Sequence, residues 1–206
     1  CPTPVVSYSI IDRNAAGGVV ITASHNPANY NGFKYKPDYG GSASPEVVAE
    51  LEAHISDAKH GQGVGVARGT IRKFDAVTPY LEHLGKLLDL DILRDAQLKI
   101  VVDSMYGAGS GFFSSILKGG NVELLEIHGE RNPAFPGLEQ PEPIGPNLQL
   151  LSEVINNEKA DVGLATDGDA DRLGLMDERG SFVTQLQTMA LLALYLMEVR
   201  GERGAL

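Results

Sequence analysis

Three aspartates in one short segment are the residues of this sequence whose types and spacing point most directly to chemistry. Asp167, Asp169 and Asp171 alternate with small residues in the run Asp-Gly-Asp-Ala-Asp-Arg. In extended backbone, alternate side chains share one face, and three carboxylates held that close repel one another unless a cation joins them. Ligand sets made only of oxygen favour Mg²⁺, Mn²⁺ or Ca²⁺ over Zn²⁺. The triplet therefore predicts a divalent-cation site, and the apolar segments on both sides disfavour a merely solvated acidic loop.

An EF-hand calcium loop is the named alternative for this segment. The three aspartates match its first, third and fifth positions, and Glu178 falls on its twelfth. Arg172, however, stands where the sharp turn of that loop requires glycine. The flanking residues also have the pattern of strands, whereas an EF-hand needs helices. We therefore disfavour the EF-hand.

A second segment, Thr22-Ala23-Ser24-His25-Asn26-Pro27, presents a serine at the end of a predicted strand. Taken alone, it is typical of an ordinary turn. Ser24 and His25 are not expected to form a dyad, because neighbouring side chains diverge in extended backbone. The serine could instead carry a phosphoryl group, whose negative charge and three oxygens would complete the ligand shell of a cation.

Two further features carry little chemistry by themselves. The glycine turn 107–111 follows a predicted strand, but Phe112 replaces the last glycine of a dinucleotide fingerprint and no Gly-Lys-Ser/Thr follows. It therefore predicts a structural turn. Lys34 lies in Asn31-Gly32-Phe33-Lys34, and taken alone it is expected to be an ordinary surface lysine.

The elements that must position these residues alternate between strand and helix. Expected strands cover residues 19–22, 33–36, 99–103, 122–127, 162–165 and 173–176, and expected helices begin at residue 3 or cover 45–55, 77–89, 112–118, 148–156 and 184–199. This alternation predicts an α/β architecture with mostly parallel sheets. A domain boundary is expected near residue 75, after the glycine-rich segment 61–69.

Two of these helices carry further expectations. Ser44 is the predicted N-cap of the helix that starts at Pro45, and Val47, Val48, Leu51 and Ile55 predict one buried face. The apolar run 189–197 predicts a buried helix that is too short to span a bilayer.

The composition narrows the classes of partner and compartment. The 206 residues carry a formal net charge of −10 and no basic cluster, which makes nucleic acid an improbable partner. The single cysteine, Cys1, cannot form a disulfide within the chain. With neither a basic leader nor a spanning segment, we expect a cytoplasmic protein without a membrane partner.

Taken together, the serine segment, the Asn-Gly-Phe-Lys segment and the aspartate segment resemble the α-D-phosphohexomutase superfamily, the phosphoglucomutase and phosphomannomutase family. Smaller matches are Thr3-Pro4, Val102-Asp103-Ser104-Met105-Tyr106-Gly107 and Asn132-Pro133-Ala134-Phe135-Pro136-Gly137. The resemblance runs through essentially the whole chain, with the motifs in the family's order.

The resemblance implies roles for eight residues, of which Ser24 is the catalytic phosphoserine. Asp167, Asp169 and Asp171 would hold Mg²⁺ together with a phosphoserine oxygen. Lys34 would be a general acid/base or an electrostatic clamp, His25 a neighbour of the transferring group, and Arg172 and Asn26 contacts to phosphate or substrate. The reaction would interconvert hexose 1-phosphate and hexose 6-phosphate through a hexose 1,6-bisphosphate, and the wording of residues 29–34 leans toward glucose or mannose.

The resemblance also implies an incomplete enzyme. Family members have four domains, and this chain would supply the late part of domain I (1–75), domain II (76–181) and the opening helix of domain III (182–206). We expect two mixed, mostly parallel α/β/α domains, the first incomplete, in a chain that has little activity without the missing domains. A divalent-cation-binding α/β module without catalysis is the alternative, and a phosphate on Ser24 would discriminate between the two.

Overall fold

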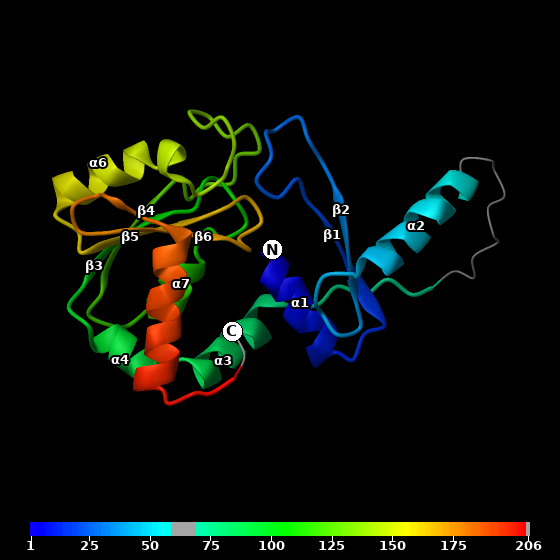
Figure 1. The fold of residues 1–206 in the computed structure, drawn as a ribbon, viewed down its shortest axis with the longest axis horizontal. Helices are drawn as coiled ribbons and strands as arrows, with labels where there is room; N and C mark the ends of the chain where they lie inside the picture. The colour runs from blue at the N-terminus through cyan, green and yellow to red at the C-terminus, as the bar shows by residue number, and fades with distance from the viewer. Residues whose placement is uncertain (59–68, 205–206) are drawn as a thin grey trace. The chain divides into compact units, whose positions relative to one another are not determined.

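A computed structural model describes residues 1–58 and 69–204 and divides the chain into two compact units. Unit 1 contains residues 1, 3–22 and 32–87, and unit 2 contains residues 2, 23–31 and 88–206. Figure 1 shows the elements of both units. Nearly all of the glycine-rich segment predicted as a linker lies outside the described residues. The domain boundary near residue 75 stays a prediction.

Unit 1 is built on a two-stranded antiparallel sheet and the helices α1 and α3. Strands β1 (Gly17–Ile21) and β2 (Phe33–Pro37) pair from Gly17 opposite Pro37 to Ile21 opposite Phe33. Helix α1 (Thr3–Asp12) packs on β1, and its Tyr8 ring stacks on His83 of α3 (Val77–Leu87) at 4.6 Å. The strand predicted at 19–22 is confirmed, although its expected burial holds for Val20 and fails for Val19 and Ile21, which are exposed.

Helix α2 (Pro45–Ala58) confirms the predicted cap and contradicts the predicted burial. The backbone N–H of Val47 donates to Ser44 Oγ at 3.4 Å. Val48 and Ile55, however, are 40% and 57% exposed. Apolar residues at helical spacing specify one face of a helix, but they do not specify the layer that covers it.

Unit 2 contains a mixed five-stranded sheet in the order β4-β3-β5-β6-β7. Its strands are β3 (Lys99–Asp103), β4 (Glu123–Ile127), β5 (Val162–Thr166), β6 (Leu173–Met176) and β7 (Phe182–Val183). Strand β3 pairs parallel with β4 and β5, whereas β5, β6 and β7 form an antiparallel meander. The α/β class and the mixed pairing are confirmed, although only two of the four strand pairings in this sheet are parallel where most were expected to be.

Five helical segments complete unit 2 and locate its core. They are α4 (Leu90–Asp95), α5 (Phe112–Leu117), the 3₁₀ turn Gly145–Asn147, α6 (Gln149–Glu158) and α7 (Gln185–Leu194), which continues as a π turn, Tyr195–Val199. Helix α6 runs along the sheet (Figure 1) and buries Leu151 and Ile155 against it. Gly163 permits this approach, because a Cβ there would lie 2.4 Å from Ile155 Cδ1.

One helix was missed and one prediction of burial needs correction. The helix expected at 77–89 is α3, which ends at Leu87, and the unpredicted helix α4 follows it, capped by the Asp89 carboxylate, which accepts the Ile92 N–H at 3.2 Å. The apolar run 189–197 is helical but not buried, since Met189 and Leu192 are 58% and 52% exposed. Among the described residues, no helix has both the length and the apolar character needed to cross a bilayer.

Candidate functional site

The three aspartates lie in the tight connection between β5 and β6. Thr166 at the end of β5 pairs with Leu173 at the start of β6, so the loop joins two antiparallel strands. The strands on both sides contradict the EF-hand alternative, which requires helices. Ala170 has a left-handed φ of 55°, and its N–H donates to Asp167 O at 3.0 Å. The acids therefore share a turn instead of the extended face that their spacing predicted.

This turn gathers the carboxylates closely enough to hold a metal ion. One oxygen from each of Asp167, Asp169 and Asp171 lies within 4.8 Å of the others. Asp167 and Asp169 are buried and Asp171 is exposed, so two acids form the base of the cluster and one its rim.

Asp167 is the most constrained of the three. Its Oδ1 accepts the backbone N–H groups of Asp171 and Arg172 at 2.9 and 3.0 Å, whereas its Oδ2 is buried without a hydrogen-bond partner. Burial, followed by the charges of Asp169 and Asp171, raises the pKa of Asp167 to about 7. A buried carboxylate oxygen without a donor, beside two further carboxylates, is a suitable ligand for a hard cation.

The serine loop of residues 23–31 lies directly against this cluster. Ser24 has a left-handed φ of 55°, and its hydroxyl donates to Asp169 Oδ1 at 3.2 Å. A Cβ at position 168 would lie 2.4 Å from Ser24 O, so glycine is required for the two loops to touch. The fold thus brings together two motifs that are 145 residues apart.

His25 also lies at this site, as the resemblance implied, but in contact with Ser24, which its position next to that residue was not expected to allow. Its Nδ1 is 3.4 Å from Ser24 Oγ. The expectation that the two side chains diverge is wrong, because it assumed extended backbone and Ser24 is left-handed. Asn26 stabilises the same loop, because its Nδ2 donates to Ala23 O at 2.8 Å.

Glu142 is a site residue that the sequence reasoning missed. Its Oε1 accepts from Arg172 Nη1 at 2.9 Å and lies 3.9 Å from His25 Nε2. The signal that could have found it is an acid between two prolines, Pro141 and Pro143. Prolines on both sides restrict the backbone of the residue between them.

The glycine turn 107–111 contacts residues 167–171, the loop of the three aspartates that could hold a cation (the metal loop), as a structural turn should. The Ala108 N–H donates to Gly168 O at 3.0 Å, and a Cβ at Gly107 would lie 2.8 Å from that oxygen. At the preceding strand end, Asp103 Oδ1 accepts from the Met105 N–H and lies 2.9 Å from His128 Nδ1. Burial raises the pKa of Asp103.

Lys34 lies on β2, half-buried, with Val20 as its partner in the sheet. It belongs to unit 1, whereas Ser24 and the aspartates belong to unit 2. Its role in proton transfer stays a prediction.

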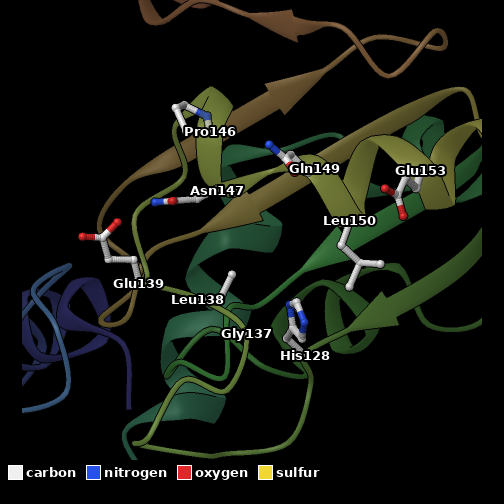
Figure 2. A pocket seen from close by; sticks show the side chains of 9 residues that line it. All are labelled: His128, Gly137, Leu138, Glu139, Pro146, Asn147, Gln149, Leu150 and Glu153. Atoms are coloured by element: carbon white, nitrogen blue, oxygen red, sulfur yellow. The ribbon is translucent and has the colours of Figure 1, made fainter.

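A separate pocket of about 320 Å³ lies elsewhere in unit 2. Figure 2 shows His128, Leu138, Glu139, Asn147, Leu150 and Glu153 around it. Its charged lining is acidic apart from the imidazole, so it has none of the lysine or arginine that a phosphate site needs. None of the site residues predicted from sequence lines it.

Comparisons with known proteins bear on the whole chain. Sequence models of the phosphoglucomutase/phosphomannomutase family match residues 1–62 as α/β/α domain I and residues 78–180 as α/β/α domain II. A phosphoglucomutase/phosphomannomutase of Thermococcus kodakarensis is 33% identical over 200 residues, which are 97% of this chain and 44% of that protein. A phosphoglucosamine mutase of Caldanaerobacter subterraneus is 34% identical over 94% of this chain and 42% of its own length.

A solved structure gives the same result. The crystal structure of a phosphoglucomutase/phosphomannomutase family protein from Burkholderia thailandensis superposes with a TM-score of 0.83 at 27% identity, over 97% of this chain and 43% of that one. The chain thus spans less than half the length of these relatives. Because a family model matches half of its residues, the chain belongs to the phosphoglucomutase/phosphomannomutase family.

Proposed function

We propose that this chain carries the phosphoserine and metal-binding parts of a phosphohexomutase, with Ser24 as the residue that holds the phosphoryl group. The observation that carries the proposal is the contact from the Ser24 hydroxyl to Asp169 Oδ1 at 3.2 Å. This contact supports the proposal because a phosphoryl group on the Ser24 oxygen would lie beside a cation bound by the three carboxylates.

The proposed substrates are phosphorylated hexoses, as the names of the relatives indicate for those proteins. A sugar hydroxyl oxygen forms a bond to the phosphorus on Ser24, the bond from phosphorus to Ser24 Oγ breaks, and the hydroxyl proton ends on Ser24 Oγ. The same step in reverse, at the other end of a hexose 1,6-bisphosphate, returns the phosphoryl group to the serine. The net result moves phosphate between positions 1 and 6 of the sugar.

The proposed cation is Mg²⁺, held by Asp167, Asp169, Asp171 and an oxygen on Ser24. The donor set is all oxygen, and the buried Asp167 Oδ2 lacks any hydrogen-bond donor, so the residues fit a hard divalent ion. When bound, such an ion neutralises charge on the transferring phosphoryl group.

The remaining residues are proposed to serve binding and proton transfer. Arg172 would contact phosphate, since a guanidinium donates two parallel hydrogen bonds to that group. His25, 3.4 Å from Ser24 Oγ, would donate to the phosphoryl oxygens. Lys34 is the proposed acid or electrostatic clamp for the sugar oxygen. Asn26, whose Nδ2 donates to Ala23 O within the serine loop, is a proposed contact to phosphate or substrate.

Phosphate on Ser24 is the direct test. Incubation with hexose 1,6-bisphosphate and Mg²⁺ should add about 80 Da to the intact mass, the mass of one phosphoryl group. Ser24→Ala should gain nothing, and the control Ser42→Ala, at an exposed serine of unit 1, should behave as the unsubstituted chain. Cation binding without any mass gain would contradict the proposal and favour the non-catalytic module.

A further inference from the structure

We infer that Glu142 is a positioning residue that sets the side chains of His25 and Arg172 beside Ser24, an inference that rests on the proposed phosphoserine function. A single oxygen, Glu142 Oε1, makes both contacts, at 2.9 Å to Arg172 Nη1 and 3.9 Å to His25 Nε2. Because the other ring nitrogen of His25 lies 3.4 Å from Ser24 Oγ, the imidazole lies between Glu142 and the nucleophile.

The carboxylate is itself held in place. Gln140 Nε2 donates to Glu142 Oε2 at 2.6 Å, so the second oxygen is engaged while the first faces His25 and Arg172. Asn147 Nδ2 donates to the backbone oxygen of Glu142 at 2.9 Å. The side chain is 19% exposed, so little of it is in contact with water.

The backbone on each side of Glu142 is fixed as well. Pro141 and Pro143 are both buried, and each fixes its own φ. Pro141 O accepts the Gly168 N–H of the metal loop at 3.2 Å. A Cβ at Gly174, on β6, would lie 2.8 Å from Pro143 O. The segment that carries Glu142 therefore contacts the metal loop at one end and β6 at the other.

This arrangement explains why an acid is needed beside groups proposed to bind an anion. The Arg172 side chain is 47% exposed, and without a partner a long arginine samples many rotamers. The contact to Glu142 selects one of them before phosphate arrives, and it also limits rotation of the His25 ring. Misplacement of such groups by about 1 Å lowers a transfer rate on the order of 100-fold.

The kinetic test compares Glu142→Gln with Glu139→Gln, which removes the same charge from an exposed acid three residues away. Both are assayed for the rate at which Ser24 gains a phosphoryl group from hexose 1,6-bisphosphate with Mg²⁺. We expect the maximal rate of Glu142→Gln to fall about tenfold or more, with an unchanged unfolding temperature. Glu139→Gln should match the unsubstituted chain. Equal rates in the two variants would overturn the inference.

A double-mutant cycle tests whether Glu142 acts through its partner. In an Arg172→Ala background, Glu142→Gln should cost at least about threefold less than in the unsubstituted chain, since coupled residues are not additive. The same cost in both backgrounds would show that Glu142 does not act through Arg172 and would overturn that part of the inference.

A spectroscopic signature separates this inference from the proposed function. The Arg172 Nε–Hε signal of ¹⁵N-labelled chain, assigned by its loss in Arg172→Lys, should move in Glu142→Gln and stay in place in Glu139→Gln. A chain that takes no phosphoryl group would overturn the phosphoserine proposal, while this spectrum would still decide whether Glu142 positions Arg172. An Arg172 signal unchanged by Glu142→Gln would overturn the positioning.

Discussion

At the scale of single residues, the three carboxylates of the site differ in how much of their hydration is lost on burial. Asp167 is fully buried, whereas Asp171 at the rim is exposed. Two backbone N–H groups stabilise the charged form of Asp167, but burial has the larger effect and its pKa is raised to about 7. A proton on Asp167 and a cation bound to the three carboxylates would therefore exclude each other.

Asp169→Asn should weaken Mg²⁺ binding by at least about tenfold, because one of three anionic ligands is lost. The fold should be retained, since the change also relieves repulsion among the acids in the metal-free protein. Calorimetric titration measures the affinity. Glu178→Gln is the matched control, an exposed acid in the turn beyond β6, and it should bind as the unsubstituted chain does. Unchanged affinity in Asp169→Asn would contradict the metal assignment.

Mg²⁺ affinity should fall as the pH drops below about 7, by close to tenfold per pH unit, because the cation must then displace a proton from Asp167. In the metal-free chain, the contribution of Asp167 to folding stability changes with pH in the opposite direction to that of a salt-bridged acid. The folded pKa is above the unfolded value, so this group destabilises the fold progressively as the pH rises from about 4 through 7.

Thermal unfolding with and without Mg²⁺ across this range measures both effects. Stabilisation by Mg²⁺ should be larger at pH 8 than at pH 6. Equal stabilisation at the two pH values would show that Asp167 is not a ligand.

At the scale of elements, the decisive contact is between two loops whose backbones touch. Ser24 and Ala170 are non-glycine residues with left-handed φ, a conformation that persists only where surrounding contacts hold it. The metal loop also contacts the glycine turn 107–111 and Pro141. The serine loop, this glycine turn and the segment of Pro141 therefore meet at Gly168.

Gly168→Ala should separate the serine loop from the metal loop, because the new Cβ would lie 2.4 Å from Ser24 O. We expect a loss of about 1–3 kcal/mol in the free energy of unfolding and a marked loss of Ser24 phosphorylation. Gly69→Ala, where a Cβ would meet nothing within 4 Å, is the control. Urea unfolding and intact mass measure the two effects. A fully phosphorylated Gly168→Ala chain would show that close loop contact is dispensable.

At the scale of the whole molecule, the chain covers 42–44% of the length of its curated relatives. A mutase must hold the non-reacting phosphate while the other end of the sugar reacts, and then bind the intermediate in the reverse orientation. Remote binding of that kind contributes to the rate itself as well as to affinity.

These residues alone should therefore convert hexose 1-phosphate to hexose 6-phosphate at no more than a trace rate. The assay couples 6-phosphate formation to a dehydrogenase, with Mg²⁺ and the bisphosphate present. Turnover in the usual enzyme range, about 1–10³ per second, would mean that the described units suffice for catalysis.

The sequence by itself determined most of the elements and predicted the residues of the candidate site. Asp167, Asp169 and Asp171 were identifiable from their own spacing, because a hard cation needs several oxygen ligands close together. The segment of Ser24 is by itself typical of an ordinary turn, so that residue was identified only through the resemblance to the family. Strands such as Lys99–Asp103 and the cap at Ser44 followed from patterns a few residues long.

Only the tertiary structure decided how these parts meet. Three features depend on left-handed backbone and on segments far apart in the chain. They are the contact from Ser24 to Asp169, the position of His25 beside Ser24, and the contacts that Glu142 makes. The burial of α2 and α7 was mispredicted for a related reason. Periodicity is a property of one helix, whereas burial depends on whether another layer lies against it.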